Sequence, residues 1–201
     1  MPPTTPSAEH PADSRAVRAA LRRERLAARM ALDDAGHAAL SSRVGTHLAA
    51  LLDALPAQTV AFCAPLRREF DARALVVRLL DRGWRAAMPV VVAAEAPMVF
   101  REWAPDAVMA VDRHGIPIPR DGAEVTPEIL LLPLVAFDSR GYRLGYGGGY
   151  FDRTLAAMVP RPLAVGIGYE LCRVADIHPE PHDIALDVLV TEAGAFHPRV
   201  K

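Results

Sequence analysis

The sequence has almost no lysine. Of its 23 basic residues, Lys201 is the sole lysine and all the others are arginines. A chain of this composition has no P-loop lysine, no Schiff-base lysine within its fold and no kinase-type strand lysine. Any phosphate group that it binds must therefore be held by guanidinium groups, by backbone N–H groups or through a metal ion.

The sequence also has little net charge and no long apolar run. Its 23 basic and 24 acidic residues give a formal net charge of −1, which provides no general attraction for a nucleic acid or an anionic membrane. A membrane-spanning helix needs about 18 apolar residues, and the longest candidates, 129–137 and 86–94, reach about half that length. We therefore expect no nucleic-acid partner and no membrane partner.

Cysteine is scarce, and the first residues contain no apolar segment of the kind found in secretory signals. Cys63 and Cys172 do not amount to a disulfide framework, so we expect a protein of the reducing cytoplasm. Residues 1–14 are rich in proline and small polar residues and show no periodicity. They are predicted to form a disordered leader, followed by a single domain over residues 15–201.

Hydrophobic residues make up 51% of the whole sequence, which is enough to build one continuous core. Two helices are predicted at residues 15–32 and 35–55, after which short apolar runs alternate with helical segments. The run Ile129–Val135 is apolar at every position, which is typical of a strand buried on both faces. The pattern predicts a three-layer α/β/α, Rossmann-like domain with a mostly parallel or mixed sheet and two added N-terminal helices. Its expected strands are 59–64, 85–92, 98–103, 129–135, 163–167 and, last in the chain, 188–191, with further helices at 72–82 and 150–158.

The segment Phe137–Thr154, FDSRGYRLGYGGGYFDRT, carries most of the chemical information. Its glycines let successive backbone N–H groups face one concavity, and the following helix adds its positive end, so the loop suits a phosphate. It also follows a buried strand, where ligands bind in open α/β sheets. The segment matches neither the dinucleotide pattern G-x-G-x-x-G nor the P-loop pattern. A plain strand-to-helix connection is the alternative interpretation.

The segment Leu131–Leu155 resembles the signature of the 5-formyltetrahydrofolate cyclo-ligases, also called methenyltetrahydrofolate synthetases, almost residue for residue. Further segments that are similar to this family occur in the family's order. They are RAALR at 18–22, PLRREFD at 65–71, MVF at 98–100, HGIPIP at 114–119 and EPHDIALDVLVTE at 180–192.

The resemblance implies an enzyme that uses ATP and Mg²⁺ to convert 5-formyltetrahydrofolate into 5,10-methenyltetrahydrofolate. The formyl oxygen would be phosphorylated first, and ADP and phosphate would be released. We expect a monomer whose partners are these small molecules. One alternative is a non-catalytic module of the same fold that binds nucleotide or folate. Another is a metal-dependent hydrolase built on His178, His182 and Asp183, although Pro179 and Pro181 oppose the helix that would bring the two imidazoles together.

The resemblance also implies roles at the ATP end of the site. Arg143, Tyr150 and Asp152 are the expected catalytic residues, and Asp152 and Asp187 the expected Mg²⁺ ligands. Both proposed Mg²⁺ ligands have a structural alternative. Asp152 could simply complement a helix dipole, and Asp187 could simply begin the last strand. The expected ATP-binding residues are Arg18, Arg22, Arg143, Gly145, Tyr146, Gly147, Gly148, Gly149, Tyr150, Phe151 and Asp152.

Two of these positions depart from the family pattern. The family commonly has lysine at Arg18 and tyrosine at Phe151. The alternative for Arg18 and Arg22 is the solvated basic face of an amphipathic helix.

For the folate end, the resemblance implies contacts from Glu69, whose carboxylate could pair with pterin N–H groups. Glu69 could instead be a surface residue beside neighbouring arginines, and aromatic residues near a strand end are more often core. The expected folate-binding residues are Glu69, Phe100, Trp103, Tyr150 and Phe151.

Overall fold

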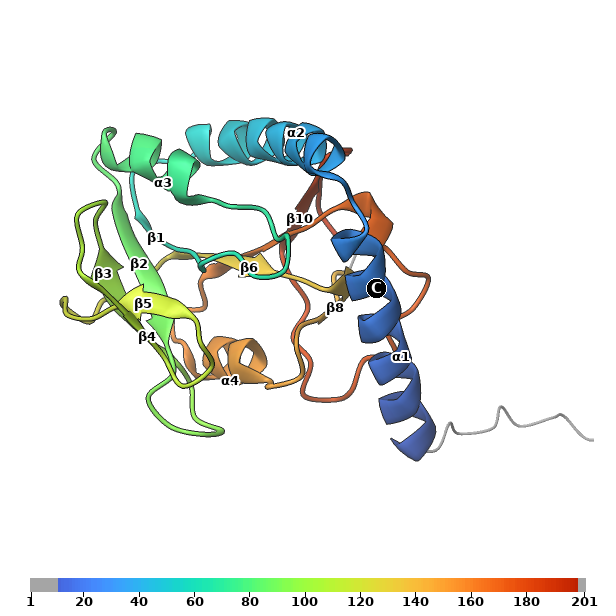
Figure 1. Cartoon of the computed structure of the whole chain (residues 1–201). Coiled ribbons are helices and arrows are strands. Elements are labelled where there is room, and N and C mark those ends of the chain that lie inside the picture. The colour runs from blue at the N-terminus through green and yellow to red at the C-terminus, as the bar shows by residue number, and fades with distance from the viewer. Residues whose placement is uncertain (1–10, 199–201) are drawn as a thin grey trace, which may run out of the picture.

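The computed structural model describes residues 11–198, with side chains from residue 14 onward. This part of the chain contains a seven-stranded sheet in the order β11-β10-β9-β6-β1-β2-β3 (Figure 1). The five inner strands run parallel, and β11 and β3 pair antiparallel at the two edges. The strands of this sheet are β1 (Thr59–Ala61), β2 (Arg85–Val90), β3 (Val99–Trp103), β6 (Ile129–Pro133), β9 (Leu163–Ile167), β10 (Val188–Thr191) and β11 (Gly194–Phe196).

Helices cover both faces of the sheet. Figure 1 shows α2 (Asp34–Asp53) and α3 (Arg73–Leu80) over one face and α4 (Tyr150–Ala157) on the other, while α1 (Pro11–Met30) stands across one side of the layers. No helix among the described residues is long and apolar enough to span a membrane. The predicted three-layer α/β/α arrangement with a mixed sheet is confirmed.

Strand β6 explains why the layers pack on both sides. Ile129 and Leu131 belong to the core cluster beneath α2 and α3, whereas Leu130 and Leu132 belong to the cluster beneath α4. Successive side chains of a strand point to opposite faces, so a strand with helices on both sides needs an apolar residue at each position. The apolar run at 129–135 therefore contains the predicted strand that is buried on both faces, β6.

The order of the parallel strands creates a crevice at one edge of the sheet. Taken in chain order, these strands lie in space as second, first, third, fourth and fifth, so the chain leaves the neighbouring strands β1 and β6 in opposite directions. Helix α3 follows β1 on one face, and α4 follows β6 on the other. In doubly wound sheets such a switch point opens a crevice beyond the carboxyl ends of the two strands, where ligands bind.

Some element boundaries differ from the prediction. Helix α1 begins at Pro11, within the predicted leader, because proline in a first helical turn loses no hydrogen bond. Residues 1–10 of that leader lie outside the described residues. The chain also continues beyond β10, which we expected to be the last strand, into β11. Two short hairpins were not predicted: β4 (Met109–Val111) with β5 (Pro117–Pro119), and β7 (Ala136–Phe137) with β8 (Arg143–Leu144).

Candidate functional site

A cavity of about 930 Å³ opens beyond the carboxyl ends of β1 and β6, at the switch point of the sheet. The segments that line it include α1, the loop after β1, the end of β2, the β4–β5 hairpin, the glycine loop with the first turn of α4, and residues 180–183. A cavity of this volume suits a ligand of cofactor size. Segments that are far apart in the sequence thus meet at one place.

Helix α1 supplies the basic wall of the cavity. Arg18 donates to both carboxylate oxygens of Asp183, and Arg22 Nε donates to the Gly145 carbonyl at 2.9 Å. The Arg18 residue is only 6% exposed. Arg18, Arg22, Arg25 and Arg29 recur at helical spacing, so they share one face of α1, and each contacts the rest of the fold. This face is therefore not the solvated basic face that was the alternative interpretation.

Arg143 and Asp152 form a second polar group in the cavity wall. An Arg143 Nη2 atom lies 3.2 Å from Asp152 Oδ1, and Arg143 also donates to the Ile184 carbonyl at 2.9 Å. Asp152 Oδ1 accepts the Ile184 N–H at 3.0 Å as well. Burial lowers the pKa of the Arg143 guanidinium, and the charges of Asp152 and Asp183 oppose this effect. Since arginine titrates far above neutral pH, Arg143 presents a permanent positive charge to the cavity.

The glycine loop adopts a backbone that side chains would disturb. Gly147 and Gly149 have φ angles of 100° and 64°, in the left-handed region that favours glycine. A Cβ atom at Gly148 would lie 2.8 Å from the Tyr150 ring. Gly149 is the N-cap of α4, so the loop leads directly into the positive end of that helix. Tyr150 and Phe151, in the first turn of α4, also line the cavity.

Glu69 also lines the cavity, in the loop after β1, and is only 6% exposed. Its Oε1 accepts the Tyr146 hydroxyl at 2.7 Å and its Oε2 accepts the Leu66 N–H at 2.9 Å. Burial raises the pKa of the Glu69 carboxyl, and the bonds from Tyr146 and Leu66 and the charge of Arg29 work against this rise. Glu69 is thus a buried carboxylate of the cavity wall and not a surface residue.

The remaining wall is largely apolar. Tyr150 meets His114 of the β4–β5 hairpin edge to face, with ring centroids 5.7 Å apart and 3.4 Å between the Tyr150 hydroxyl and His114 Nε2. The cavity therefore has an arginine-rich end and an end suited to a flat, partly apolar ligand. The apolar lining consists of Met88, Pro89, Val91, Met98, Ile116, Pro117 and Phe151.

The comparison with known proteins decides the family. A sequence model of the 5-formyltetrahydrofolate cyclo-ligase family matches residues 14–192. The chain belongs to the 5-formyltetrahydrofolate cyclo-ligase family. The cyclo-ligase of Haemophilus influenzae is 32% identical over 155 residues, which cover 73% of this chain and 83% of that relative. The cyclo-ligase of Escherichia coli K12 is 33% identical over 147 residues, covering 70% and 81%.

Solved structures agree with this assignment. The 5,10-methenyltetrahydrofolate synthetase of Aquifex aeolicus superposes with a TM-score of 0.79 at 29% identity, covering 92% of this chain and 94% of that one. The synthetase of Mycoplasma pneumoniae gives a TM-score of 0.71 at 26% identity, covering 87% and 98%. The cyclo-ligase fold thus extends over nearly the whole chain.

Most residues that the cyclo-ligase resemblance implies are brought together at the cavity. Those that line it are Arg18, Arg22, Glu69, Arg143, Gly145, Tyr146, Gly147, Gly148, Gly149, Tyr150, Phe151 and Asp152. Two of the expected folate-binding aromatics are not among them. Phe100 packs in the core beneath α4, and Trp103 packs in the core beneath α2 and α3, edge to face with Phe62 at 5.0 Å. As residues of β3, both fill the sheet layers, which is the alternative interpretation that the sequence had left open.

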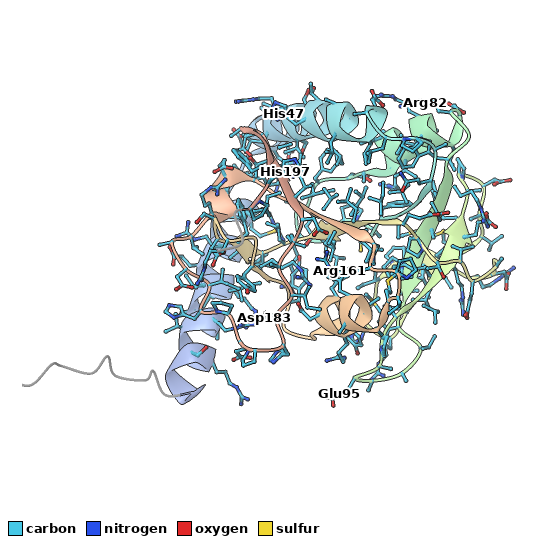
Figure 2. All side chains as sticks on the ribbon, turned by 180° about the vertical axis from the view of Figure 1, so that it is seen from behind. His47, Arg82, Glu95, Arg161, Asp183 and His197 are labelled. Atoms are coloured by element: carbon cyan, nitrogen blue, oxygen red, sulfur yellow. The ribbon has the colours of Figure 1, made fainter. Side chains whose placement is uncertain are left out.

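Asp187 is also not part of the cyclo-ligase cavity. Its Oδ2 accepts the Ala164 N–H at 2.7 Å and its Oδ1 pairs with Arg161 at 2.7 Å. Figure 2 shows Asp183 beside α1 and Arg161 farther from that helix, nearer the middle of the view. The position of Asp187 just before β10 therefore serves the sheet, and the structure does not place it beside Asp152.

The histidine-rich segment 178–183 forms no zinc centre of the kind a hydrolase needs. Asp183 is paired with Arg18, and His182 Nε2 lies 3.4 Å from Glu180 Oε2. Within residues 11–198, no three His, Cys, Asp or Glu side chains are grouped so that they could hold a metal ion. Asp152 fits the different demands of Mg²⁺, which usually takes one or two carboxylates together with substrate phosphates and water. Both contacts of Asp152 within the fold use Oδ1, and its side chain is 18% exposed in the cavity wall.

The sequence analysis missed Arg29 and the ion pair of Arg18 with Asp183. Arg29 is 1% exposed and contacts both Glu69 and Tyr146. A signal for Arg29 was present, because it continues the helical spacing of Arg18 and Arg22 along α1. No comparable signal existed for Asp183, which reaches Arg18 across 165 positions of the sequence.

Proposed function

We propose that the chain is a 5-formyltetrahydrofolate cyclo-ligase that uses ATP and Mg²⁺ to form 5,10-methenyltetrahydrofolate, ADP and phosphate. The observation that carries this proposal is the single cavity that joins an arginine- and glycine-rich end to an apolar end containing one buried carboxylate, Glu69. The arginine- and glycine-rich end suits a nucleoside triphosphate, and the apolar end suits a pterin ring. Both ends open into the same space, as a reaction between the two ligands demands.

At the phosphate end, Arg18, Arg22 and Arg143 supply permanent positive charge from two separate elements. The N–H groups of the glycine loop and the N-terminus of α4 add hydrogen-bond donors. In our proposal these groups hold the triphosphate so that its γ-phosphorus faces the folate. Phosphoryl transfer is accelerated mainly by such positioning and by neutralisation of the phosphate charge.

The reaction proceeds in two steps. The formyl oxygen attacks the γ-phosphorus and forms an O–P bond, while the bond from that phosphorus to the bridging oxygen breaks and ADP leaves. Nitrogen 10 of the folate then attacks the activated formyl carbon and loses its proton. The C–O bond breaks and phosphate departs, because a phosphate is a far better leaving group than an amide oxygen. The product contains the closed five-membered ring of the methenyl group.

Asp152 is the proposed Mg²⁺ ligand. When bound, the ion would neutralise charge on the phosphate oxygens and orient them. Arg143 holds Oδ1 of Asp152 from behind, together with the Ile184 N–H, so the carboxylate keeps a fixed direction in the cavity.

At the folate end, Glu69 is proposed to accept hydrogen bonds from pterin N–H groups. Phe151 and Met98 add apolar surface to the same cavity, and Tyr150, held against His114, is proposed to lie near the formyl group. The segments that line this cavity extend along the chain from α1 to residue 183, which supports a single domain over residues 15–201. Cys63 and Cys172 are free thiols, which is compatible with the cytoplasm.

The test mixes the purified protein with 5-formyltetrahydrofolate, ATP and Mg²⁺ and follows the near-ultraviolet absorbance of the methenyl product. We expect product only when all three components are present. Absence of product from the complete mixture, with ATP and folate still bound, would identify the chain as a binding module instead.

A further inference from the structure

The guanidinium of Arg29 is one of the most buried charged groups among the described residues. It comes from α1, is 1% exposed, and contacts three separate segments of the cavity wall. Its Nε donates to the Arg67 carbonyl at 2.9 Å, and its Nη1 donates to the Leu134 carbonyl at 2.8 Å. Its Nη2 donates to the Tyr146 hydroxyl at 2.9 Å and lies 3.5 Å from Glu69 Oε1. One planar group thus connects the loops that follow β1 and β6 with the glycine loop.

The backbone next to Glu69 shows why such a connection matters. Arg67 and Arg68 have φ angles of 46° and 61°, and both lie in the left-handed region that residues with a Cβ rarely adopt. The carbonyl of Arg67 accepts from Arg29, and the carbonyl of Arg68 contacts His37 Nε2 at 3.2 Å. This strained turn aims the Glu69 side chain into the cavity, and the surrounding structure holds the turn in place.

We propose that Arg29 is a positioning residue for folate binding: it fixes the Glu69 carboxylate in the cavity and supplies the positive charge that compensates it. This inference rests on the proposed function, in which Glu69 accepts pterin N–H groups. Arginine suits this role better than lysine, since a planar fork can reach carbonyls, a hydroxyl and a carboxylate at once. Arg29 does not line the cavity, whereas Glu69 and Tyr146, which it contacts, do, so it acts through them.

The charge state of Glu69 makes the inference testable. The ionised carboxylate offers both oxygens as acceptors, whereas protonation turns one of them into an O–H donor. Burial raises the pKa of Glu69, whereas Tyr146, the Leu66 N–H and Arg29 each lower it, and the Cys63 thiol is the other titratable group that faces it. Removal of Arg29 should therefore raise the pKa of Glu69 further. Folate binding would then weaken at neutral pH and recover as the pH rises through that higher pKa.

The experiment measures the Kd of 5-formyltetrahydrofolate by calorimetry without ATP, and KM for both substrates, from pH 6 to pH 9. For Arg29→Gln we expect a folate Kd about tenfold weaker than the wild-type Kd at pH 7, which improves toward pH 9 as more of the Glu69 carboxyl ionises. KM for ATP should stay within about twofold of the wild-type value, because Arg29 does not line the cavity. Arg29→Lys, which keeps the charge, should restore part of the binding and most of the wild-type pH profile.

Arg25→Gln is the matched control. Arg25 lies one helical turn before Arg29 on α1 and donates to the Leu171 carbonyl, away from Glu69, so its loss removes the same charge without changing the pH profile. In the double variant Arg29→Gln with Glu69→Gln, folate binding should be no weaker than in Glu69→Gln alone, and it should not depend on pH. That result would show that Arg29 acts through Glu69.

A folate Kd in Arg29→Gln that is unchanged, or weakened equally at every pH, overturns the inference. If Arg29→Gln does not fold, Tyr146→Phe decides, since it removes another bond to Glu69 and should weaken folate binding in the same alkaline-reversible way. A folate Kd in Tyr146→Phe that does not recover toward alkaline pH would be equally fatal. Failure of the proposed function has a different signature, because wild-type protein would then form no methenyl product at any pH.

Discussion

Asp152 and Asp187 are both candidate magnesium ligands in the sequence, yet their surroundings differ. Asp152 lies in the cavity wall against the buried Arg143, while Asp187 binds the Ala164 N–H and Arg161 outside that cavity. The sequence favours the metal role for Asp152, whereas for Asp187 it supports the metal role and a simple place at the start of a strand about equally. Only the packing of α4 and of the segment before β10 decides which carboxylate faces the ligands.

This difference yields a prediction at the residue scale. Asp152→Asn keeps an oxygen that can accept the Ile184 N–H but loses the charge opposite Arg143. We expect kcat to fall on the order of 100-fold, a typical cost of removing one preorganised charged group, and the Mg²⁺ concentration for half-maximal rate to rise. Steady-state kinetics over a Mg²⁺ titration measures both.

Asp187→Asn is the matched control for that titration. It removes a carboxylate of the same type from the pair with Arg161, so its Mg²⁺ dependence should equal that of the wild type. A wild-type Mg²⁺ curve for Asp152→Asn, or a shifted curve for Asp187→Asn, would contradict our assignment of the ligand.

At the scale of single elements, the inner strands were the most predictable part of the fold. Strands β9 and β10 have the predicted boundaries, and β6 lies within the predicted run, because continuous apolar runs can be buried only between two layers. The β4–β5 hairpin was missed because its strands have only three residues each and β5 contains Pro117 and Pro119. Helix α1 was predicted as a helix, but its buried arginine face could not be, since arginine faces are normally solvated.

Alanine substitutions at two glycines in different elements should change the free energy of unfolding in opposite directions. At Gly45, in the interior of α2, an added Cβ would meet the Phe70 ring at 3.6 Å, which is ordinary contact. Gly45→Ala should raise the free energy of unfolding by up to about 1 kcal/mol, through the higher helix propensity of alanine. At Gly166 in β9, an added Cβ would lie 2.3 Å from Leu186 Cδ1 and 3.0 Å from Leu189 Cδ2.

Gly166→Ala should therefore lower the free energy of unfolding by about 1–3 kcal/mol, the usual cost of overpacking a core. Urea denaturation with an unchanged m-value measures both variants on one scale. Equal midpoints for the two variants would show that the packing around β9 is looser than the structure indicates.

At the scale of the whole molecule, the sheet type was predictable and the strand order was not. Backbone hydrogen bonds are the same for any pair of neighbouring strands, and the apolar runs of β1, β6 and β9 resemble one another too closely to specify neighbours. The order places the switch point between β1 and β6, and therefore brings the loop carrying Glu69 to face the glycine loop. The meeting of these two loops is the part of the site that the residues alone could not reveal.

Because the cavity joins α1 to the sheet, its ligands should stabilise the whole molecule. A ligand at about 100 times its Kd adds about 2.7 kcal/mol to the free energy of unfolding. For a protein of this size that corresponds to a rise in Tm of about 5–10 °C. We expect ATP with Mg²⁺ to produce such a rise in a thermal scan. AMP, which lacks the phosphates that the arginine wall is proposed to hold, should produce a much smaller one, and equal shifts would place the nucleotide elsewhere.

The arginine wall of the cavity has a practical consequence for labelling chemistry. Reagents that acylate or alkylate amines react with lysine side chains and leave guanidinium groups untouched, and residues 11–198 contain no lysine. A dye, a biotin group or a solid support can therefore be attached through Lys201 while every cation that lines the cavity stays unmodified. Immobilised protein prepared in this way should keep its ligand affinity, which makes the chain well suited to surface-based binding measurements.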